Sequence, residues 1–321
     1  YGDAQDLECI EDRGTLQMAD PETVSERVYE RGKDQIGTLG SGNHFVEIGY
    51  VSEIYDDATA QAFGLYPRHM TVMIHTGSRG LGYQICDDSI REMLRASVKY
   101  GIDLPDRQLC AAPLSSPEGK KYFSAMAAAA NYAFANRQMI MHWVYQTLES
   151  TLGMKRQALG LSLLYDVSHN IAKLEKHNVE GEEQLVCVHR KGATRAFGPG
   201  HPALTPRYRH TGQPVLIPGD MGRASYVLCG TTQAMKETFG STCHGAGRIM
   251  SRSQAMKASQ GRSLYDELAA NGISVRAASK ATLAEEMPEA YKDVSKVVQV
   301  VHEAGISKLV AKITPLGCIK G

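Results

Sequence analysis

Apolar residues along the chain gather in short runs that end at loops rich in glycine, histidine or asparagine. Runs of this length, bounded by turn-forming residues, are typical of strands, although Phe45, Ile48 and Tyr50 alternate with polar positions only in part. The pattern predicts strands at 45–51, 70–75, 159–167, 215–218 and 224–228, with the last two paired.

Longer stretches predict helices at 25–32, 83–100, 118–150 and 249–261, and the chain after Arg262 is again helical in character. The stretch 118–150 lacks proline and is rich in alanine and methionine, so we expect a buried scaffold helix with His142 and Trp143 as packing residues. Strands ending in loops, without regular βαβ alternation, predict an α+β fold. No repeat or linker interrupts the sequence, so we expect residues 1–321 to form a single compact domain of mixed and antiparallel sheets flanked by helices.

Hydrophobic residues make up 43% of the 321 residues and charged residues 22%, which is typical of a soluble globular protein. The 35 basic residues balance the 35 acidic ones, so the overall charge favours neither nucleic acid nor a membrane surface, and any polyanion site must be local. Seven scattered cysteines without a C-x-x-C pair argue against a disulfide framework. No apolar run approaches the roughly 18 residues that span a bilayer, and together these features predict a cytoplasmic location.

The sequence is organised around residues 239–249, Phe-Gly-Ser-Thr-Cys-His-Gly-Ala-Gly-Arg-Ile, with His244 at the centre. Glycines directly after a histidine let the backbone approach a ligand and turn its N–H groups toward an anion. Arg248 adds a fork-shaped charge that suits phosphate oxygens. The segment is therefore a candidate phosphate site with a nucleophilic or acid–base imidazole, and the alternative is a buried structural histidine in a glycine-rich turn.

Three further histidines stand at or near the ends of predicted strands, beside loops that contain glycine or asparagine: His44, His75 and His169. The loop before His44 is glycine-rich but lacks the Lys-Ser/Thr ending of a P-loop. Neutral imidazoles from separate elements are a usual way to build a transition-metal site. The alternative is three unrelated loop histidines, because spacing this wide does not establish that they converge.

A basic stretch lies between Gln184 and Gly219, where the sequence has no aspartate or glutamate. Its charged residues suit a polyphosphate or an RNA backbone, and the alternative is a solvated basic loop. The cationic side chains are Arg190, Lys191, Arg195, Arg207 and Arg209.

Six segments, taken together, resemble the RtcB-type RNA ligases and occur in the order of that family across nearly the whole chain. They are Gly-Ser-Gly-Asn-His-Phe-Val-Glu at 40–47, His-Thr-Gly-Ser-Arg-Gly-Leu-Gly at 75–82, Ser-His-Asn at 168–170, His-Arg-Lys-Gly-Ala-Thr at 189–194, Pro-Gly-Asp-Met-Gly at 218–222 and Cys-His-Gly-Ala-Gly-Arg at 243–248.

The resemblance implies GTP- and Mn²⁺-dependent joining of an RNA 3′-phosphate or 2′,3′-cyclic phosphate to a 5′-hydroxyl end, as in tRNA splicing and RNA repair. It implies that His244 attacks the α-phosphate of GTP and forms a histidine–guanylate intermediate. It also implies two Mn²⁺ ions per site, RNA substrates such as tRNA halves or broken RNA ends, and the small protein archease as a partner. We expect no membrane association and a monomer or weak oligomer.

The resemblance also assigns roles to individual residues. His44, His75 and His169 match the manganese-binding histidines. A carboxylate in the guanylate pocket can accept hydrogen bonds from guanine N1–H and N2–H and so select guanine over adenine. The expected guanylate-binding residues are Asn43, His44, Phe45, Val46, Glu47, His169, Asn170, Pro218, Gly219, Asp220, Met221, Ser225, His244, Gly245, Ala246, Gly247, Tyr291 and Lys320. RNA or phosphate contact is assigned to Arg79, Arg190, Lys191, Arg195 and Arg248.

Two departures from the family pattern affect this transfer. Asp220 and Arg223 stand where the family usually has serine and a small residue or threonine, so the pocket is expected to differ locally. The glycine-framed Asp-x-x-Cys motif that supplies the other metal ligands is missing, and Asp6-Leu-Glu-Cys9 has only its spacing. Without that negative charge the site should bind Mn²⁺ weakly. We therefore expect the chain to be the C-terminal two-thirds of a ligase, with little ligation by this part alone.

Two other functions fit the same residues. A metal-dependent RNA phosphoesterase would keep the histidines and use His244 as an acid or base. A non-catalytic fragment that binds RNA or guanylate is favoured by the missing Asp-x-x-Cys motif.

Overall fold

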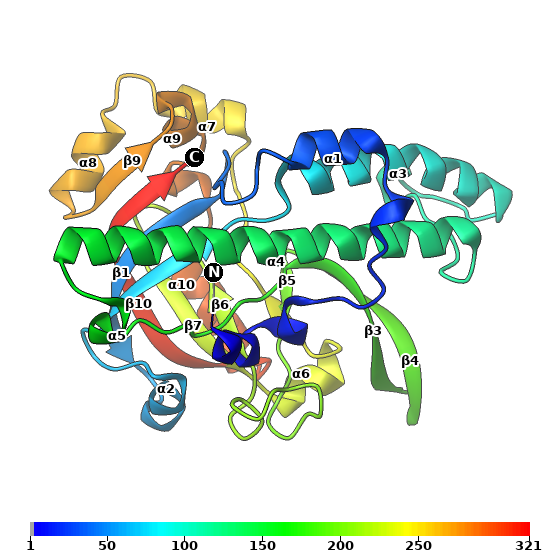
Figure 1. The fold of residues 1–321 in the computed structure, drawn as a ribbon, viewed down its shortest axis with the longest axis horizontal. Helices are drawn as coiled ribbons and strands as arrows, with labels where there is room; N and C mark the ends of the chain where they lie inside the picture. The colour runs from blue at the N-terminus through cyan, green and yellow to red at the C-terminus, as the bar shows by residue number, and fades with distance from the viewer. Residues whose placement is uncertain (1–2) are drawn as a thin grey trace. The chain divides into compact units, whose positions relative to one another are not determined.

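The computed structural model describes residues 3–321, and its contacts divide them into two compact units. One unit, which we call the helical unit, contains Gly14–Thr38 and Thr76–Leu159. The other, the mixed unit, contains Asp3–Arg13, Leu39–His75 and Gly160–Gly321. The predicted α+β class with antiparallel strands and flanking helices is confirmed (Figure 1). The expectation of a single domain stays a prediction.

The helical unit is built on α4 (Pro117–Leu152), which confirms the helix predicted at 118–150. Ser116 caps its first turn by accepting a hydrogen bond from the Gly119 N–H, and Pro117 starts the helix where no N–H is needed. The Trp143 side chain is 45% exposed, so its assignment as a packing residue was wrong: it lies on a solvent-facing stripe of the helix. The remaining elements are η3 (Pro21–Thr23), α1 (Glu26–Gly32), α3 (Arg79–Lys99), η4 (Arg107–Leu109) and α5 (Arg156–Leu159).

Asn136 of α4 is the buried polar centre of the helical unit. Its Oδ1 accepts from the backbone N–H groups of Gly37 at 2.7 Å and Thr38 at 3.2 Å. Its Nδ2 donates to the carbonyl oxygens of Thr38 at 3.2 Å and Gly77 at 3.1 Å. One fully buried amide therefore holds two segments of the helical unit, around Thr38 and around Gly77, against α4.

An Asn136→Ala substitution is expected to lower the free energy of unfolding by about 3 kcal/mol, because it removes four hydrogen bonds of a fully buried amide and leaves a void in its place. Urea denaturation measures the change. Asn131→Ala is the matched control on the same helix, because Asn131 is only half-buried and bonds to Leu16 alone. An equal or larger loss in the control would contradict the role given to Asn136.

The mixed unit contains a sheet of six strands in the order β2-β1-β10-β7-β6, with β9 paired to β10. All its pairs are antiparallel except β9 with β10. The predicted strands at 45–51, 70–75, 215–218 and 224–228 are confirmed. The strands are β1 (Phe45–Ile54), β2 (Met70–His75), β6 (Pro214–Ile217), β7 (Ser225–Gly230), β9 (Ser274–Ala277) and β10 (Ser307–Lys320).

The sequence prediction differs from the sheet in two places. The apolar run 159–167 is not a strand: only Asp166 forms an isolated bridge, with Ile10. This run is apolar because Leu163, Leu164 and Tyr165 pack their side chains into the core. The longest strand, β10, was missed entirely although it lies between β1 and β7.

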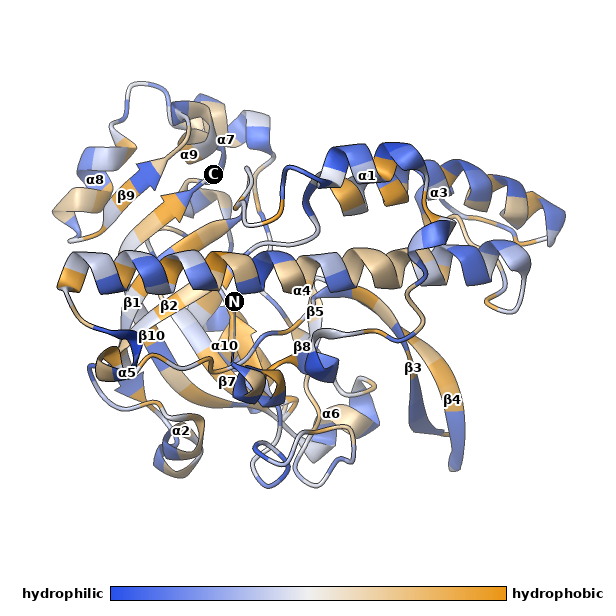
Figure 2. Ribbon diagram, viewed as in Figure 1, coloured by the Kyte–Doolittle hydropathy of each residue, from blue (hydrophilic) through white to orange (hydrophobic). Residues whose placement is uncertain are grey.

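Apolar side chains cover both faces of the sheet. Figure 2 shows hydrophobic residues along β2 and β7. Val227 joins one cluster, while Tyr226 and Leu228 on the opposite face of β7 join another. The helices of the unit are η1 (Ala4–Cys9), η2 (Glu11–Gly14, whose last residue belongs to the helical unit), α2 (Asp57–Phe63), α6 (Thr232–Glu237), α7 (Arg252–Ala258), α8 (Leu264–Ala270), α9 (Lys280–Glu285), η5 (Pro288–Ala290) and α10 (Val294–Glu303). Within residues 3–321, no helix is both long enough and apolar enough to cross a membrane.

Two small antiparallel pairs complete the mixed unit and matter most for the site. β3 (Asn170–Val179) pairs with β4 (Glu182–Lys191), and β5 (Ala193–Arg195) pairs with β8 (Ser241–Cys243). Because β4 runs into β5 through Gly192 alone, the two pairs are continuous in the chain. They connect the segment that carries His169 to the segment that carries His244.

Candidate functional site

Four histidines from four separate segments of the mixed unit are brought together. His44 comes directly before β1, and His75 is the last residue of β2, opposite Phe45 in the ladder. His169 comes directly before β3, and His244 directly follows β8. The convergence left open by the sequence is therefore present in the structure.

The imidazoles form a compact group. The rings of His169 and His244 are stacked, with centroids 3.7 Å apart and an interplanar angle of 12°. His75 meets both edge-on, at 5.2 Å from His169 and 5.0 Å from His244, and its Nε2 lies 3.3 Å from Nε2 of His244. The His44 ring is 5.9 Å from that of His75.

The closest three nitrogens do not come from the three histidines expected to bind metal. One ring nitrogen each from His75, His169 and His244 lies within 4.8 Å of the others, so His244 stands where His44 was expected. This is the one such group of three or more His, Cys, Asp or Glu side chains among residues 3–321. The His44 ring lies beside this group, where it contacts the His75 ring.

Gly192 fixes the stacked pair through its backbone. Its N–H donates to the His169 carbonyl at 3.0 Å, and its own carbonyl accepts from the His244 N–H at 3.1 Å. The residue has a φ of +63°, in the left-handed region that favours glycine. One residue thus sets the spacing between the two chain segments that carry the stacked rings.

The donor set fits a divalent transition metal. Burial, and then the neighbouring imidazoles of His244 and His169, hold the pKa of His75 well below its usual value, so this ring is neutral at physiological pH. The Nδ1 atom of His75 is buried and has no hydrogen-bond partner among the described residues. Neutral imidazole nitrogens are ligands for several transition metals, so the set fits a metal without selecting Mn²⁺.

A cavity of about 330 Å³ opens beside the imidazoles. Most of the residues expected to bind guanylate line it, together with the expected metal ligand His75 and the expected phosphate contacts Lys191 and Arg248. The predicted residues on its wall are Asn43, Phe45, His75, His169, Asn170, Lys191, Pro218, Gly219, Asp220, Met221, His244, Gly245, Ala246, Gly247, Arg248, Tyr291 and Lys320.

Two buried carboxylates lie at this side of the sheet. Burial raises the pKa of Glu47 to about 7, the nearby Asp220 adds to the rise, and the Ser225 hydroxyl, which donates to Glu47 Oε1 at 2.9 Å, opposes it. Burial likewise raises the pKa of Asp220 to about 6. The low polarity of their surroundings thus keeps both carboxyl groups protonated to a higher pH than carboxyl groups in water.

The unusual residues at 220 and 223 compensate each other. Arg223 Nε lies 3.5 Å from Asp220 Oδ2, and Arg223 also donates to the carbonyls of Tyr291 at 3.3 Å and Lys292 at 3.0 Å. The charge added by Asp220 is therefore paired locally. The arginine also fastens the β6–β7 turn to the segment that carries Tyr291.

Arg248 lines the cavity but is already held by several partners. It donates to Glu286 Oε1 and the Tyr291 hydroxyl, each at 3.0 Å, and to the Glu285 carbonyl at 2.6 Å. The Tyr291 hydroxyl in turn donates to Glu286 Oε2. Lys320, at the end of β10, is 5% exposed, donates to the Gly42 carbonyl at 3.1 Å, and has a pKa lowered by burial.

Other predicted residues lie outside the cavity wall. Val46 and Glu47 lie on β1, Ser225 begins β7, and His44 directly precedes β1. Arg79 belongs to the helical unit, where its Nε donates to Thr38 Oγ1 at 3.2 Å.

Arg190 and Arg195 are corrected from RNA contacts to structural residues. They are 2% and 4% exposed, and each is paired with carboxylates from outside the basic stretch. Arg190 bonds to Glu175 at 2.7 and 2.8 Å, and Arg195 to Asp12 at 2.9 Å. The carboxylates that pair with these two arginines are thus supplied by other segments of the chain.

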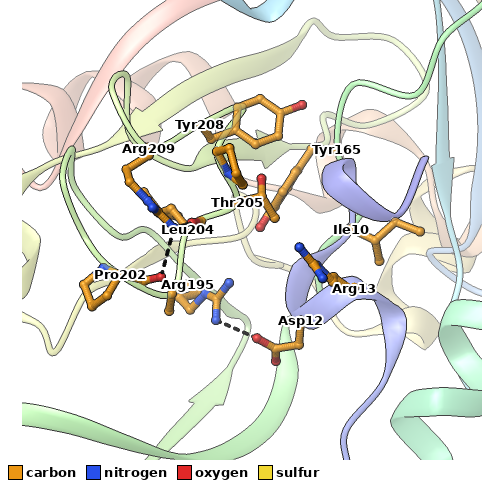
Figure 3. Close-up of a pocket in the computed structure, with 12 residues that line it drawn as sticks. Ile10, Asp12, Arg13, Tyr165, Arg195, Pro202, Leu204, Thr205, Tyr208 and Arg209 are labelled. Carbon is orange, nitrogen blue, oxygen red and sulfur yellow. Dashed lines mark hydrogen bonds and ion pairs between the residues drawn. The ribbon is translucent and has the colours of Figure 1, made fainter. Parts of the chain in front are cut away.

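Arg195 also borders a second cavity of about 300 Å³, between η2 and the loop 202–209 (Figure 3). Its guanidinium is committed there to Asp12 and to Gln213, whose Oε1 accepts at 2.9 Å. Arg209 at the same cavity donates to the Leu204 carbonyl at 2.9 Å. This cavity contains none of the clustered histidines.

The candidate pair Asp6 and Cys9 is not part of the metal group. Cys9 is 2% exposed and packs in an apolar cluster with Phe63 and Tyr208. The Asp6 carboxylate accepts from the Asp3 N–H as part of a capping box. The Asp6 side chain therefore caps η1, and the Cys9 side chain belongs to the apolar core.

Sequence reasoning missed four residues that line the main cavity: Gly192, Arg252, Glu286 and Val294. Gly192 sits inside the quoted segment 189–194, so its place in that box was an available signal. Glu286 had no such signal in the sequence, because its role depends on hydrogen bonds with Arg248 and Tyr291 that form only in the folded protein.

The comparisons with known proteins extend over the whole chain. The family model described as tRNA-splicing ligase RtcB matches residues 1–321. A protein of Archaeoglobus fulgidus named tRNA-splicing ligase RtcB is 56% identical over 321 residues, which are 100% of this chain and 67% of that protein. Proteins of the same name from Thermococcus kodakarensis and Pyrococcus abyssi are 54% and 55% identical over 100% of this chain, and it covers 67% and 35% of them.

These matches and the site define the class of the protein, which is that of the RNA ligases, a class of enzymes. The chain belongs to the tRNA-splicing ligase RtcB family. It spans 67% of the length of two of the relatives named above and 35% of the third.

Proposed function

We propose that the protein joins an RNA 3′-phosphate or 2′,3′-cyclic phosphate end to a 5′-hydroxyl end, using GTP as guanylate donor. Its substrates would be tRNA halves or broken RNA ends. The observation that carries this proposal is the convergence of four imidazoles from distant segments beside a cavity lined by residues expected to bind guanylate. Family membership supports the same reaction.

In the proposed reaction a His244 nitrogen attacks the α-phosphorus of GTP, forms a P–N bond and releases pyrophosphate. A 2′,3′-cyclic phosphate end would first be opened by water, which breaks the P–O2′ bond and leaves a 3′-phosphate and a 2′-hydroxyl. An oxygen of the RNA 3′-phosphate then attacks the phosphorus of the histidine–guanylate, breaks the P–N bond and takes up the guanylate. Finally the 5′-hydroxyl oxygen of the second strand attacks the 3′-phosphorus, loses its proton and displaces GMP. Lys191 and residues 245–247 line the cavity in which the phosphate oxygens would lie. Backbone N–H groups of such a glycine-rich segment can bind an anion.

The histidines would also hold the metal that the family implies. His75 and His169, with His44 beside them, would be its ligands, and bound Mn²⁺ would neutralise charge on the phosphate oxygens. We propose that the remaining Asp and Cys ligands come from a segment of the protein outside residues 1–321. A cytoplasmic location, a monomer or weak oligomer, and archease as a partner are part of the same proposal.

The test is covalent labelling of the full-length protein with [α-³²P]GTP and Mn²⁺, followed by denaturation. The proposal predicts label that is stable in alkali and lost in acid, as expected for a phosphorus–nitrogen bond on histidine. ATP should compete poorly. RNA binding without label would favour a non-catalytic binding protein, and cleavage of RNA without label would favour a phosphoesterase.

A further inference from the structure

Arg190 is a buried arginine, and most of the N–H donors of its guanidinium group form hydrogen bonds within the protein. Its Nη1 and Nη2 form the bidentate pair with Glu175, at 2.7 and 2.8 Å. Its Nε donates to Ser241 Oγ at 2.9 Å, and Nη2 also donates to the Phe239 carbonyl at 3.0 Å. Four of the five N–H donors of this guanidinium are therefore accounted for by these contacts.

These partners belong to the two segments that carry the stacked histidines. Glu175 is on β3, which starts directly after His169. Ser241 is on β8, which ends directly before His244. Arg190 itself is on β4, two residues before Gly192, whose backbone bonds to both histidines. The guanidinium thus cross-links the same segments that Gly192 joins through its backbone.

We propose that Arg190 is a positioning residue for the ligation reaction, which holds His169 and His244 in their stacked arrangement by clamping β3 to β8 through Glu175 and Ser241. This inference rests on the proposed function, because it assigns Arg190 to the geometry of the attacking imidazole. The side chain is 1% exposed and is not among the residues that line the cavity beside the histidines, so it acts on them through the segments that it joins.

The geometry explains why an arginine is required. A lysine would keep a positive charge near Glu175, but it cannot bond to Glu175 in the bidentate form and reach Ser241 and Phe239 from one planar group. A misplacement of a reacting group by about 1 Å can cost on the order of 10²-fold in rate. A loosened clamp should therefore slow the chemical step far more than it weakens GTP binding, because only two of the residues on the cavity wall, His169 and His244, are the clamped ones.

Arg195 provides a matched control within the same stretch of chain. It is also buried and paired, but it bonds to Asp12 and Gln213, which belong to other segments. Arg190→Lys and Arg195→Lys each replace a buried guanidinium group with an amine. Only the first should affect the histidines.

The experiment measures single-turnover guanylylation of the full-length protein and records imidazole ¹H–¹⁵N spectra without metal. Arg190→Lys is expected to lower the guanylylation rate constant at least 10-fold with the GTP KM within about twofold of wild type. The His169 and His244 signals should shift in this variant. Arg195→Lys should lose stability while keeping both the rate constant and these signals.

Two results would overturn the proposal: an unchanged rate and unchanged imidazole signals in Arg190→Lys, or an equal rate loss in Arg195→Lys. If Arg190→Lys does not fold, Ser241→Ala removes one arm of the clamp and leaves the pair with Glu175. It should lower the rate constant severalfold and shift the His244 signal, and no change in either would also reject the clamp. The spectra do not depend on catalysis, so a wild-type protein that takes no label rejects the proposed function without deciding the clamp.

Discussion

A His244→Ala substitution is expected to abolish covalent labelling by GTP, lowering guanylylation by at least roughly 10⁴-fold, as in other enzymes that lose their nucleophile. Metal binding should change far less. The attacking nitrogen must carry a free lone pair toward phosphorus, so it cannot be a permanent metal ligand. Whether His244 is the nucleophile or a metal ligand must be tested, because its Nε2 lies only 3.3 Å from His75 Nε2, within the group of three close nitrogens.

His75→Ala provides the contrast, because His75 contacts all three of the other histidines. We expect it to weaken Mn²⁺ binding by 10-fold or more, measured by electron paramagnetic resonance titration of the full-length protein. His189→Ala, an exposed histidine on β4, is the control and should keep both label and metal. If His244→Ala weakened metal binding as much as His75→Ala, His244 would be a metal ligand, and the proposed separation of the nucleophile from the metal-binding histidines would be wrong.

The segments that carry the site could be predicted because their signals are local. An apolar run followed by a histidine and a glycine-rich loop marks a strand end that faces a ligand, as at His75. The reverse order, a glycine-rich loop and a histidine before an apolar run, marks a strand start, as at His44. The convergence of the four histidines was not a local property. It depends on the ladder between β1 and β2, and on the backbone of Gly192.

The failures have the same origin. Strand β10 contains Pro315 and Gly317, which argue against a central strand when read alone. The structure accommodates them because a register shift between Ile48 and Gly49 of β1 lies at this point. Arg190 and Arg195 looked like surface charges because Glu175 and Asp12, their partners, lie in other segments of the sequence. Counting charge along a stretch does not reveal partners that folding brings to it.

A Glu47→Gln substitution is expected to stabilise the protein at alkaline pH while damaging guanine selection. Glu47 is 1% exposed, and its pKa is about 7 in the folded protein against 4.5 for an ordinary glutamate. Between these values the folded state binds more protons than the unfolded state, so the free energy of unfolding falls as pH rises from 4.5 to 7. The cost of ionising Glu47 is therefore fully present above pH 7 and amounts to roughly 3 kcal/mol.

Glutamine removes that cost, because it is neutral and its Oε1 can still accept the Ser225 hydroxyl that bonds to Glu47 at 2.9 Å. The gain in unfolding free energy should be near zero at pH 4.5 and approach roughly 3 kcal/mol at pH 8, as measured by urea denaturation. Glu53→Gln, at the exposed end of the same strand, should show no comparable pH-dependent gain.

The same variant should reduce the preference for GTP over ATP at least 10-fold in the labelling assay, since an amide cannot accept from guanine N1–H and N2–H together. Stability and selection would then change in opposite directions at one buried carboxyl. A protein that was less stable at pH 8 as Glu47→Gln, or that kept its full preference for GTP, would show that Glu47 serves the sheet and not the nucleotide. In that case Asp220, which lines the cavity itself, would be the remaining carboxylate able to read guanine.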